Sequence, residues 1–156
     1  MKSDSTMRLR NTLSIRNKKA SFEFIFLEEF VAGVSLVGTE VKSIKTNGAS
    51  FTDSYCYFKD NELFLKNLHI SECKLVRNNE QHEPKRDRKL LLTKRELKNL
   101  KESSLEKGLT IIPTKLFMND KGLIKVSISL CKGKKLYDKR VSLREKEEKK
   151  NLRAII

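Results

Sequence analysis

Short stretches of the chain alternate apolar and polar residues with a period of two, which is typical of half-buried β-strands. The clearest is residues 124–130 (IKVSISL), whose alternation predicts one buried face and one polar face. Alternating phenylalanines at 22–26 predict a strand with one aromatic face. After two glutamates, Gly33 permits a turn or bulge, and a second short strand is expected over residues 34–37.

Two further patterns predict a hairpin and a distorted strand. Residues 54–58 and 62–65 are rich in β-forming side chains and flank a turn that contains Asp60 and Asn61. Residues 109–117 are also β-like, but Pro113 cannot donate a hydrogen bond to a neighbouring strand. We therefore expect this strand to lie at an edge or to contain a bulge.

Two helices are expected from a change of period and from capping residues. In residues 38–45 two apolar side chains lie three positions apart, and Thr39 could cap the helix. Residues 93–96 (TKRE) match the capping box, in which the Thr hydroxyl and the Glu carboxylate each satisfy a free helix N–H. Gly108 is placed to end this second helix.

The fold class predicted from these elements is mainly β (α+β), with about six strands and two or three helices in a small closed or nearly closed barrel. At 156 residues the chain fits one domain. We expect a flexible basic segment over residues 1–16, a folded body over residues 17–137 and a basic tail over residues 138–156. The polar stretch 72–88 is long for a loop in a compact domain, and such loops are often functional.

The charge of the chain points to an anionic partner. Hydrophobic residues make up 38% and charged residues 35% of the sequence, and the formal net charge is +14. Charge of that size on one small domain favours a polyanion, because lysines and arginines that neutralise phosphates release condensed counterions. The alternative is a basic protein that has no specific partner.

Several classes of protein are disfavoured by what the sequence lacks. No apolar run approaches the ~20 residues of a membrane helix, and no secretory signal is present, so a cytoplasmic location is expected. Cys56, Cys73 and Cys131 are odd in number and widely spaced, which indicates free thiols. Without metal-ligand, phosphate-loop or dinucleotide motifs, we expect no cofactor, no metal site and no enzymatic activity. His69 is interpreted as a structural hydrogen-bonder and His82 as a solvated side chain.

Basic residues gather in three places near aromatic rings. Cations can hold phosphates and an exposed ring can stack on an unpaired base, while no DNA recognition-helix motif or zinc finger appears, so RNA is the favoured partner. The alternative is that each cluster is an ordinary solvated face. The clusters are Lys18 and Lys19 before the phenylalanines, Arg86, Arg88 and Lys89 before the capped helix, and Lys132, Lys134, Lys135, Lys139 and Arg140 around Tyr137.

Five blocks of sequence carry a family resemblance. They are GTEVKS at 38–43, DSY at 53–55, RDRKLLL at 86–92, KGLT at 107–110 and GKKLYDKR at 133–140. In content, order and spacing they resemble the SsrA-binding protein family, also called small protein B or SmpB. Several blocks are six residues or longer, so chance is a poor explanation.

The resemblance implies an OB-like closed antiparallel β barrel and a bacterial RNA-binding adaptor. Members of the family bind the tRNA-like domain of transfer-messenger RNA (tmRNA, or SsrA RNA) and deliver it to the A site of stalled ribosomes in trans-translation. Elongation factor Tu and alanyl-tRNA synthetase are implied as indirect partners, and we expect a monomer that does not contact membranes. Matched position by position, the implied RNA-facing residues are Lys18, Lys19, Leu91, Lys125 and the segment that contains Lys132, Lys134 and Lys135. Lys42 is a further RNA-binding candidate.

The resemblance also implies that the tail probes the empty mRNA channel, with Tyr137 placed to stack on a base of the decoding centre. Three departures from the family stand out. Val31 replaces a Glu that some members use for RNA binding, Glu148 replaces a frequent Trp, and the chain ends at Ile156 without the last basic residues of longer members. The implied ribosome-facing residues are Tyr137, Asp138, Lys139, Arg140, Arg144, Lys146, Lys149 and Lys150.

The tail has little that could stabilise a helix in isolation. Residues 144–151 contain no apolar side chain, although Glu145 and Lys149 form a favourable i,i+4 pair. A short helix without packing is marginal in water, because nucleation is costly. We therefore expect a tail that is disordered when free and helical on the ribosome. The alternative function for the whole chain is a basic structural ribosomal or ribosome-assembly protein.

Overall fold

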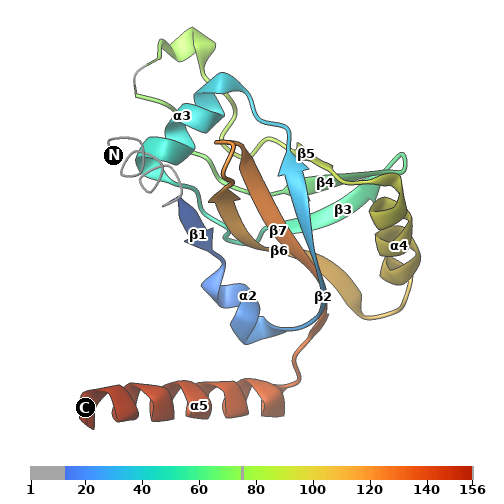
Figure 1. Ribbon diagram of the computed structural model, residues 1–156, viewed down its shortest axis with the longest axis vertical. Coiled ribbons are helices and arrows are strands. Elements are labelled where there is room, and N and C mark those ends of the chain that lie inside the picture. Colours follow the sequence, from blue (N-terminus) through green and yellow to red (C-terminus); the bar gives the residue numbers. More distant parts are fainter. Residues whose placement is uncertain (1–12, 75, 156) are drawn as a thin grey trace.

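The structure is a computed structural model that describes residues 13–74 and 76–155 (Figure 1). In this part of the chain seven strands form one sheet, with four α-helices and one short 3-10 turn around it. The strands are β1 (Ser14–Arg16), β2 (Phe24–Val34), β3 (Tyr55–Lys59), β4 (Glu62–Lys66), β5 (Arg88–Leu91), β6 (Leu109–Met118) and β7 (Ile124–Gly133). The helices are α2 (Lys18–Glu23), α3 (Gly38–Asn47), α4 (Lys94–Ser104) and α5 (Leu136–Ile155), and the 3-10 turn is η1 (Asn78–Glu80).

The strand pairings form a closed circuit. The order in the sheet is β1-β6-β3-β4-β5-β2-β7, and an additional pairing joins β7 back to β6. Each of these neighbours runs antiparallel to the next. Six strands therefore hydrogen-bond in a ring, which leaves few unpaired edges, and β1 is added outside the ring on β6.

The interior of the ring is apolar, as the alternation of the strands predicts. Along β7 the side chains of Ile124, Val126 and Ile128 are buried, while Lys125 and Ser127 between them are half-buried on the other face. These side chains join a core cluster to which every strand of the ring and the inner sides of α3 and α4 contribute. The buried face predicted for residues 124–130 is thus confirmed.

Several local predictions are confirmed. The hairpin of β3 and β4 turns through Asp60 and Asn61, both of which have positive φ. Helix α4 begins where the capping box predicts, because Thr93 Oγ1 accepts a hydrogen bond from the backbone N–H of Glu96 at 3.2 Å. The ladder between β6 and β7 shifts register between Pro113 and Lys115, which is the expected bulge.

The chain before Gly38 differs from the prediction. Residues 18–23 form α2 instead of the start of an aromatic strand, because Asn17 Oδ1 accepts a hydrogen bond from the N–H of Ala20 and caps a helix there. Strand β2 then runs through Gly33 without a turn, and a bulge between Phe26 and Glu28 absorbs the irregularity. The separate strand expected over 34–37 is therefore wrong.

Other boundaries also move. Residues 14–16 form β1 and pair with β6, although we expect a flexible segment over residues 1–16. Residues 1–12 of that segment lie outside the described part of the chain. Helix α4 ends at Ser104, ahead of Gly108, which instead takes a φ of 88° in the turn before β6. Thr39 does not cap α3, because the N-cap residue is Val37. Glu40 Oε1 accepts a hydrogen bond from the backbone N–H of Val37 at 2.9 Å.

The helices lie at different places around the ring. Figure 1 shows α3 and α5 at opposite ends of the long axis, with the sheet between them. Helix α4 flanks the β3–β4 hairpin, and Lys101 Nζ donates to Asn61 Oδ1 in the turn of that hairpin. Among the helices described, none is both long and apolar enough to span a membrane.

Candidate nucleic-acid interface

Gly33 brings two of the implied RNA-facing residues together. In the register of the sheet it lies opposite Leu91 of β5 on one side and opposite Lys125 of β7 on the other. A Cβ at Gly33 would lie 3.3 Å from Leu91 Cβ and 3.5 Å from Lys125 Nζ. The absence of a side chain therefore lets an apolar side chain and a cation meet on one surface.

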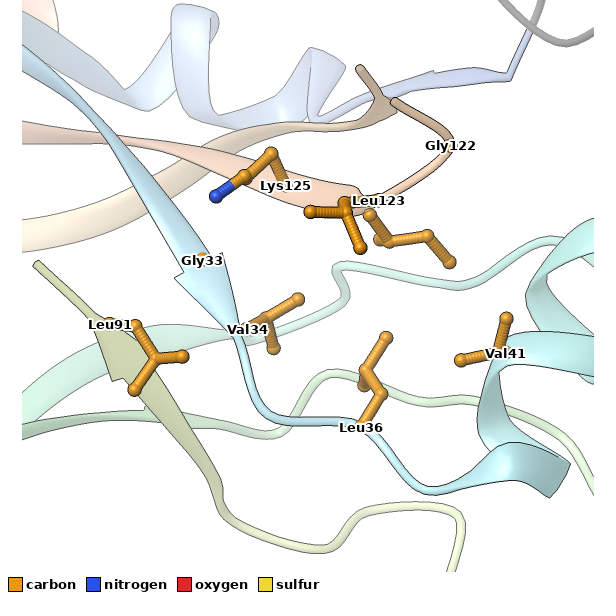
Figure 2. A pocket seen from close by; sticks show the side chains of 9 residues that line it. Gly33, Val34, Leu36, Val41, Leu91, Gly122, Leu123 and Lys125 are labelled. Atoms are coloured by element: carbon orange, nitrogen blue, oxygen red, sulfur yellow. The ribbon is translucent and has the colours of Figure 1, made fainter. Parts of the chain in front are cut away.

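A pocket of about 320 Å³ opens beside this junction (Figure 2). Its walls are mostly apolar side chains from β2, β5, β7, α3 and the loops next to them, and Lys125 supplies the cation. Leu91 is 54% exposed, and Val31, two residues before Gly33 on β2, is 58% exposed. Apolar surface beside a single ammonium group suits a base or ribose whose phosphate lies next to it. The remaining lining residues are Val34, Leu36, Val41, Gly122, Leu123 and Ile124.

A second concave surface joins the start of the fold to the tail. Lys18 lines a groove of about 710 Å³ together with Lys146 of α5. One predicted RNA-facing residue and one predicted ribosome-facing residue therefore line the same groove. Arg16 and Lys115 add two more cations to this groove. Lys19 points elsewhere and forms a 3.8 Å ion pair with Glu23 on the surface of α2. Glu29 is the one carboxylate among the described lining residues, so four cations leave the groove with a net positive charge that suits the backbone of a nucleic acid.

Lys134 makes contacts that the sequence does not reveal. Its backbone N–H donates to Glu23 O at 2.8 Å, and its Nζ donates to Ser21 O at 3.1 Å and to Ser142 Oγ at 2.7 Å. The side chain therefore joins the end of α2 to α5. Its neighbours Lys132 and Lys135 are exposed.

The ribosome-facing residues predicted in the tail lie on α5, which is mostly exposed. Tyr137 and Asp138 belong to its first turn, but their side chains lie outside the described residues. Lys139 is half-buried. The remaining candidates are all exposed: Arg140, Arg144, Lys146, Lys149 and Lys150.

Arg88 is the clearest correction to the predicted interface. Its side chain is fully buried, with Nε 2.5 Å from Glu40 Oε2, and it also donates to the carbonyls of Leu68 and Pro84. The Nη2 atom of Arg86 lies 2.6 Å from the other oxygen of Glu40. The alternation of β5 directs Arg88 inward with the core, so its guanidinium is not available to RNA.

Burial and hydrogen bonding act in opposite directions on Glu40. Removal from water raises the pKa of the carboxyl, but hydrogen bonds from Arg86, the Val37 N–H and Arg88 lower it by more. The net result is a pKa below the ordinary value of 4.5. Glu40 is therefore an anion at neutral pH, and it compensates the buried charge of Arg88.

The other basic candidates lie at the surface. Lys89 pairs with Glu62 at 2.8 Å, and both side chains are partly exposed. Lys42 is exposed on α3 and lines a shallow pocket of about 550 Å³ with Arg86. His82 lines the same pocket but is buried, not solvated as expected, since its ring nitrogens lie 2.9 Å from Thr39 Oγ1 and from Ile70 O.

The groups that could carry other chemistry are enclosed. Cys56, Cys73 and Cys131 are buried free thiols, and burial raises the pKa of Cys131 to about 12. A thiol with such a pKa is not a nucleophile at neutral pH. Within residues 13–74 and 76–155, no group of His, Cys, Asp and Glu side chains could hold a metal ion.

The fold and its surfaces define a class: a small, strongly basic β protein that exposes lysines beside apolar side chains, as nucleic-acid-binding proteins do. The family model described as SmpB protein matches residues 14–156. The chain belongs to the SmpB family, which confirms the resemblance in its sequence blocks.

Individual relatives agree with this assignment. The SsrA-binding protein of Phocaeicola vulgatus is 48% identical over 140 residues, which cover 90% of this chain and 93% of the relative. The SsrA-binding protein of Thermosipho melanesiensis is 47% identical over 137 residues, which cover 88% of this chain and 92% of the relative. A solved structure described as "tmRNA-SmpB: a journey to the center of the bacterial ribosome" is similar with a TM-score of 0.69 at 38% identity, covering 85% of this chain and 96% of that chain.

Proposed function

We propose that this chain is an RNA-binding adaptor of trans-translation. It binds the tRNA-like domain of tmRNA and delivers that RNA to the A site of stalled ribosomes. The observation that carries the proposal is the junction at Gly33. There this chain, which belongs to the SmpB family, places Leu91 and Lys125 side by side at the surface. The names of its relatives, which are SsrA-binding proteins, support RNA as the ligand.

The surface around Gly33 serves as the main RNA contact. The pocket receives a base or ribose against Leu91, and the ammonium of Lys125 holds the adjoining phosphate. Val31 extends the apolar part of this surface, where some family members have a Glu. The contact at that position is therefore apolar in this chain.

The tail acts on the ribosome. Helix α5 carries its cations on exposed positions, which suits a segment that enters the rRNA-lined mRNA channel when that channel is empty. We further propose that the ring of six strands is an OB-like barrel, supported by the closed circuit of pairings. Elongation factor Tu and alanyl-tRNA synthetase are partners through the RNA and not through this chain.

Binding to RNA tests the first part of the proposal. The protein should bind the tRNA-like domain of tmRNA more tightly than bulk tRNA at moderate ionic strength. Leu91→Ala should weaken this binding by at least about fivefold. Lys125→Ala should also lower the slope of log affinity against log salt by roughly 0.7–0.9, because one phosphate contact is lost. Leu105→Ala and Lys107→Ala are matched controls, since both residues are exposed on the turn before β6, and equal losses in these controls would sink the assignment.

A truncation tests the second part. A chain that ends after Tyr137 keeps the Gly33 surface and loses most of α5. It should bind the tRNA-like domain and fail to support tagging of stalled chains in a reconstituted translation system. Loss of both activities together would place the tail inside the tmRNA site. A structural ribosomal protein would instead copurify with ribosomes at about one copy each.

A further inference from the structure

Three aromatic rings lie next to one another on the outer face of the β3–β4 hairpin. In β3 the buried Cys56 lies between Tyr55 and Tyr57, so the two tyrosines point outward. Phe64 of β4 lies opposite Tyr57 in the register. The rings of Tyr57 and Phe64 are stacked with centroids 5.9 Å apart, and the Tyr55 ring is 6.3 Å from that of Tyr57.

These rings are held in place and remain partly exposed. Tyr57 donates its hydroxyl proton to Asp87 at 2.7 Å, which fixes the orientation of the central ring. Tyr55 is 37% exposed, and Tyr57 and Phe64 are half-buried. Aromatic side chains that serve only the core point inward, as Phe58 does here in contact with the core cluster.

Cations lie over and next to the rings. Lys66 Nζ lies 5.8 Å from the centroid of Tyr57, and Lys59 is exposed on the same face of β3. Lys89 of β5 lies opposite Phe64 in the register and pairs with Glu62. Together with Glu62 and Asp87, these lysines leave the face almost balanced in charge. A ligand would therefore be held here mainly by the rings.

The ring-bearing face is continuous with the proposed RNA contact. Lys89 and Leu91 point outward from the same strand, because the buried Leu90 lies between them. Leu91 lines the Gly33 pocket, and Lys89 lies opposite Phe64 in the register. A single RNA strand could thus pass from the pocket to the rings along β5.

We propose that Tyr55, Tyr57 and Phe64 form a stacking platform for unpaired bases of an RNA strand, distinct from the Gly33 pocket. Every base presents a π-face to a ring, so the platform accepts different sequences, whereas paired bases in a helix are not free to stack on it. Lys59 and Lys66 add a weaker contact to the backbone of the strand. The choice of RNA as ligand rests on the proposed function, and the test below separates the two.

The platform makes a prediction that differs from that for Lys125. Stacking involves no counterion release, so loss of a ring should lower affinity without changing its salt dependence. The probe is a labelled single-stranded oligoadenylate of about 12 nucleotides, followed by fluorescence anisotropy. Tyr55→Leu and Phe64→Leu should each weaken binding by about fivefold to tenfold with an unchanged salt slope, and Tyr55→Phe, which keeps the ring, should bind as the unchanged chain does.

The chain offers a matched control and an internal signal. Phe117→Leu removes a ring on β6 that has its own lysine, Lys115, at 5.1 Å, and this change should leave oligoadenylate binding unaltered. The chain has no Trp and three Tyr, so its fluorescence comes from tyrosine alone. In a Tyr137→Phe background the emission comes from Tyr55 and Tyr57, and oligoadenylate should quench it.

The outcomes separate the platform from the function. If the tRNA-like domain is bound and the two Leu variants bind oligoadenylate like the unchanged chain, the platform is refuted alone. If neither the tRNA-like domain nor oligoadenylate is bound, RNA is not the ligand, and the proposed function is wrong as well as the platform. A Tyr55→Leu variant that changes the oligomeric state in sedimentation while RNA binding is unaffected would identify a protein interface and overturn the proposal. Circular dichroism of each variant confirms that the compared proteins are folded.

Discussion

Replacement of Glu40 by Gln should destabilise the fold far more than a surface charge change does. Glu40 is fully buried, and it is the carboxylate that faces both Arg88 at 2.5 Å and Arg86 at 2.6 Å. Gln keeps the shape of the side chain but removes its charge. The guanidinium of Arg88 then remains in the interior without an anion.

The size of the effect follows from the surroundings of Arg88. Removing one partner of a buried ion pair costs about 3–5 kcal/mol. Arg88 keeps the carbonyls of Leu68 and Pro84 as acceptors, so we expect a loss of about 3 kcal/mol, at the lower end of that range. Arg86 is partly exposed and can turn to water, so it adds little. For a chain of this length the loss corresponds to a fall in Tm of roughly 6–12 °C.

Urea unfolding followed by circular dichroism measures this loss, and the chain provides a matched control. Glu62→Gln removes the same kind of carboxylate from its pair with Lys89, but both side chains are partly exposed, so the change should cost at most about 1 kcal/mol. The double variant Glu40→Gln with Arg88→Met removes both buried charges and should be less destabilised than the sum of the single variants. Equal losses in Glu40→Gln and Glu62→Gln would refute the account of the buried pair.

The pH dependence provides a second check with a definite sign. The pKa of Glu40 is lower in the folded protein than its ordinary value of 4.5. Its contribution to stability is therefore fully present above pH 4.5 and is lost as the pH falls through the folded pKa. The difference in free energy of unfolding between the unchanged chain and Glu40→Gln should be largest at neutral pH and shrink in acid. A difference that grows in acid would contradict this assignment.

Three further predictions concern the interface and the tail. Lys134→Met should loosen α5 from α2 because the bonds to Ser21 O and Ser142 Oγ are lost, and distance measurements between spin labels on the two helices should then broaden; an unchanged distribution would contradict the role of Lys134. Gly33→Ala should leave stability within about 1 kcal/mol, since reduced freedom of the unfolded chain offsets crowding against Leu91, but it should weaken tmRNA binding measured by gel shift. A peptide of residues 137–156 should show little helicity by circular dichroism, because α5 exposes nearly all its described side chains and the peptide lacks the contacts of Lys134. A strongly helical peptide would refute the expectation that the isolated tail is disordered.

Elements whose signals are local were predicted from the sequence. The Thr93 cap of α4, the turn of the β3–β4 hairpin and the alternation of β7 each depend on residues within one short segment. Helix α2 was missed because it has only six residues, too few for a helical period to show, and because phenylalanines spaced by two suggest a strand. The hydrogen bond from Ala20 to Asn17 decided the outcome, and an Asn before a short polar run is a weak signal of it.

The sequence predicts that the strands form a closed or nearly closed barrel, but it does not predict which strands pair to close it. Pairing between β6 and β7 follows from their adjacency in sequence, but β2 pairs with β7 across about a hundred residues. Long-range pairings of this kind are set by the packing of the whole core and leave no local pattern. The family resemblance therefore names Leu91 and Lys125 as RNA-facing, but neither it nor the spacing predicts that the two side chains meet at Gly33.

The run of basic residues at 86–89 shows how register overrides charge. Counting cations suggests one surface cluster, yet the period of two along β5 sends Arg88 inward with Leu90 and sends Lys89 outward with Leu91. Alternation carried back from Leu90 would have predicted a buried arginine, and a buried arginine requires a carboxylate.

Which carboxylate it finds cannot be predicted from spacing, since Glu40 lies 48 residues away. The pair nevertheless explains why α3 and β5 are placed as they are. Glu40 and Val41 are adjacent on α3, and Arg88 and Leu91 belong to the same short strand. The buried ion pair therefore fixes the relative position of Val41 and Leu91, which form two walls of the pocket beside Gly33.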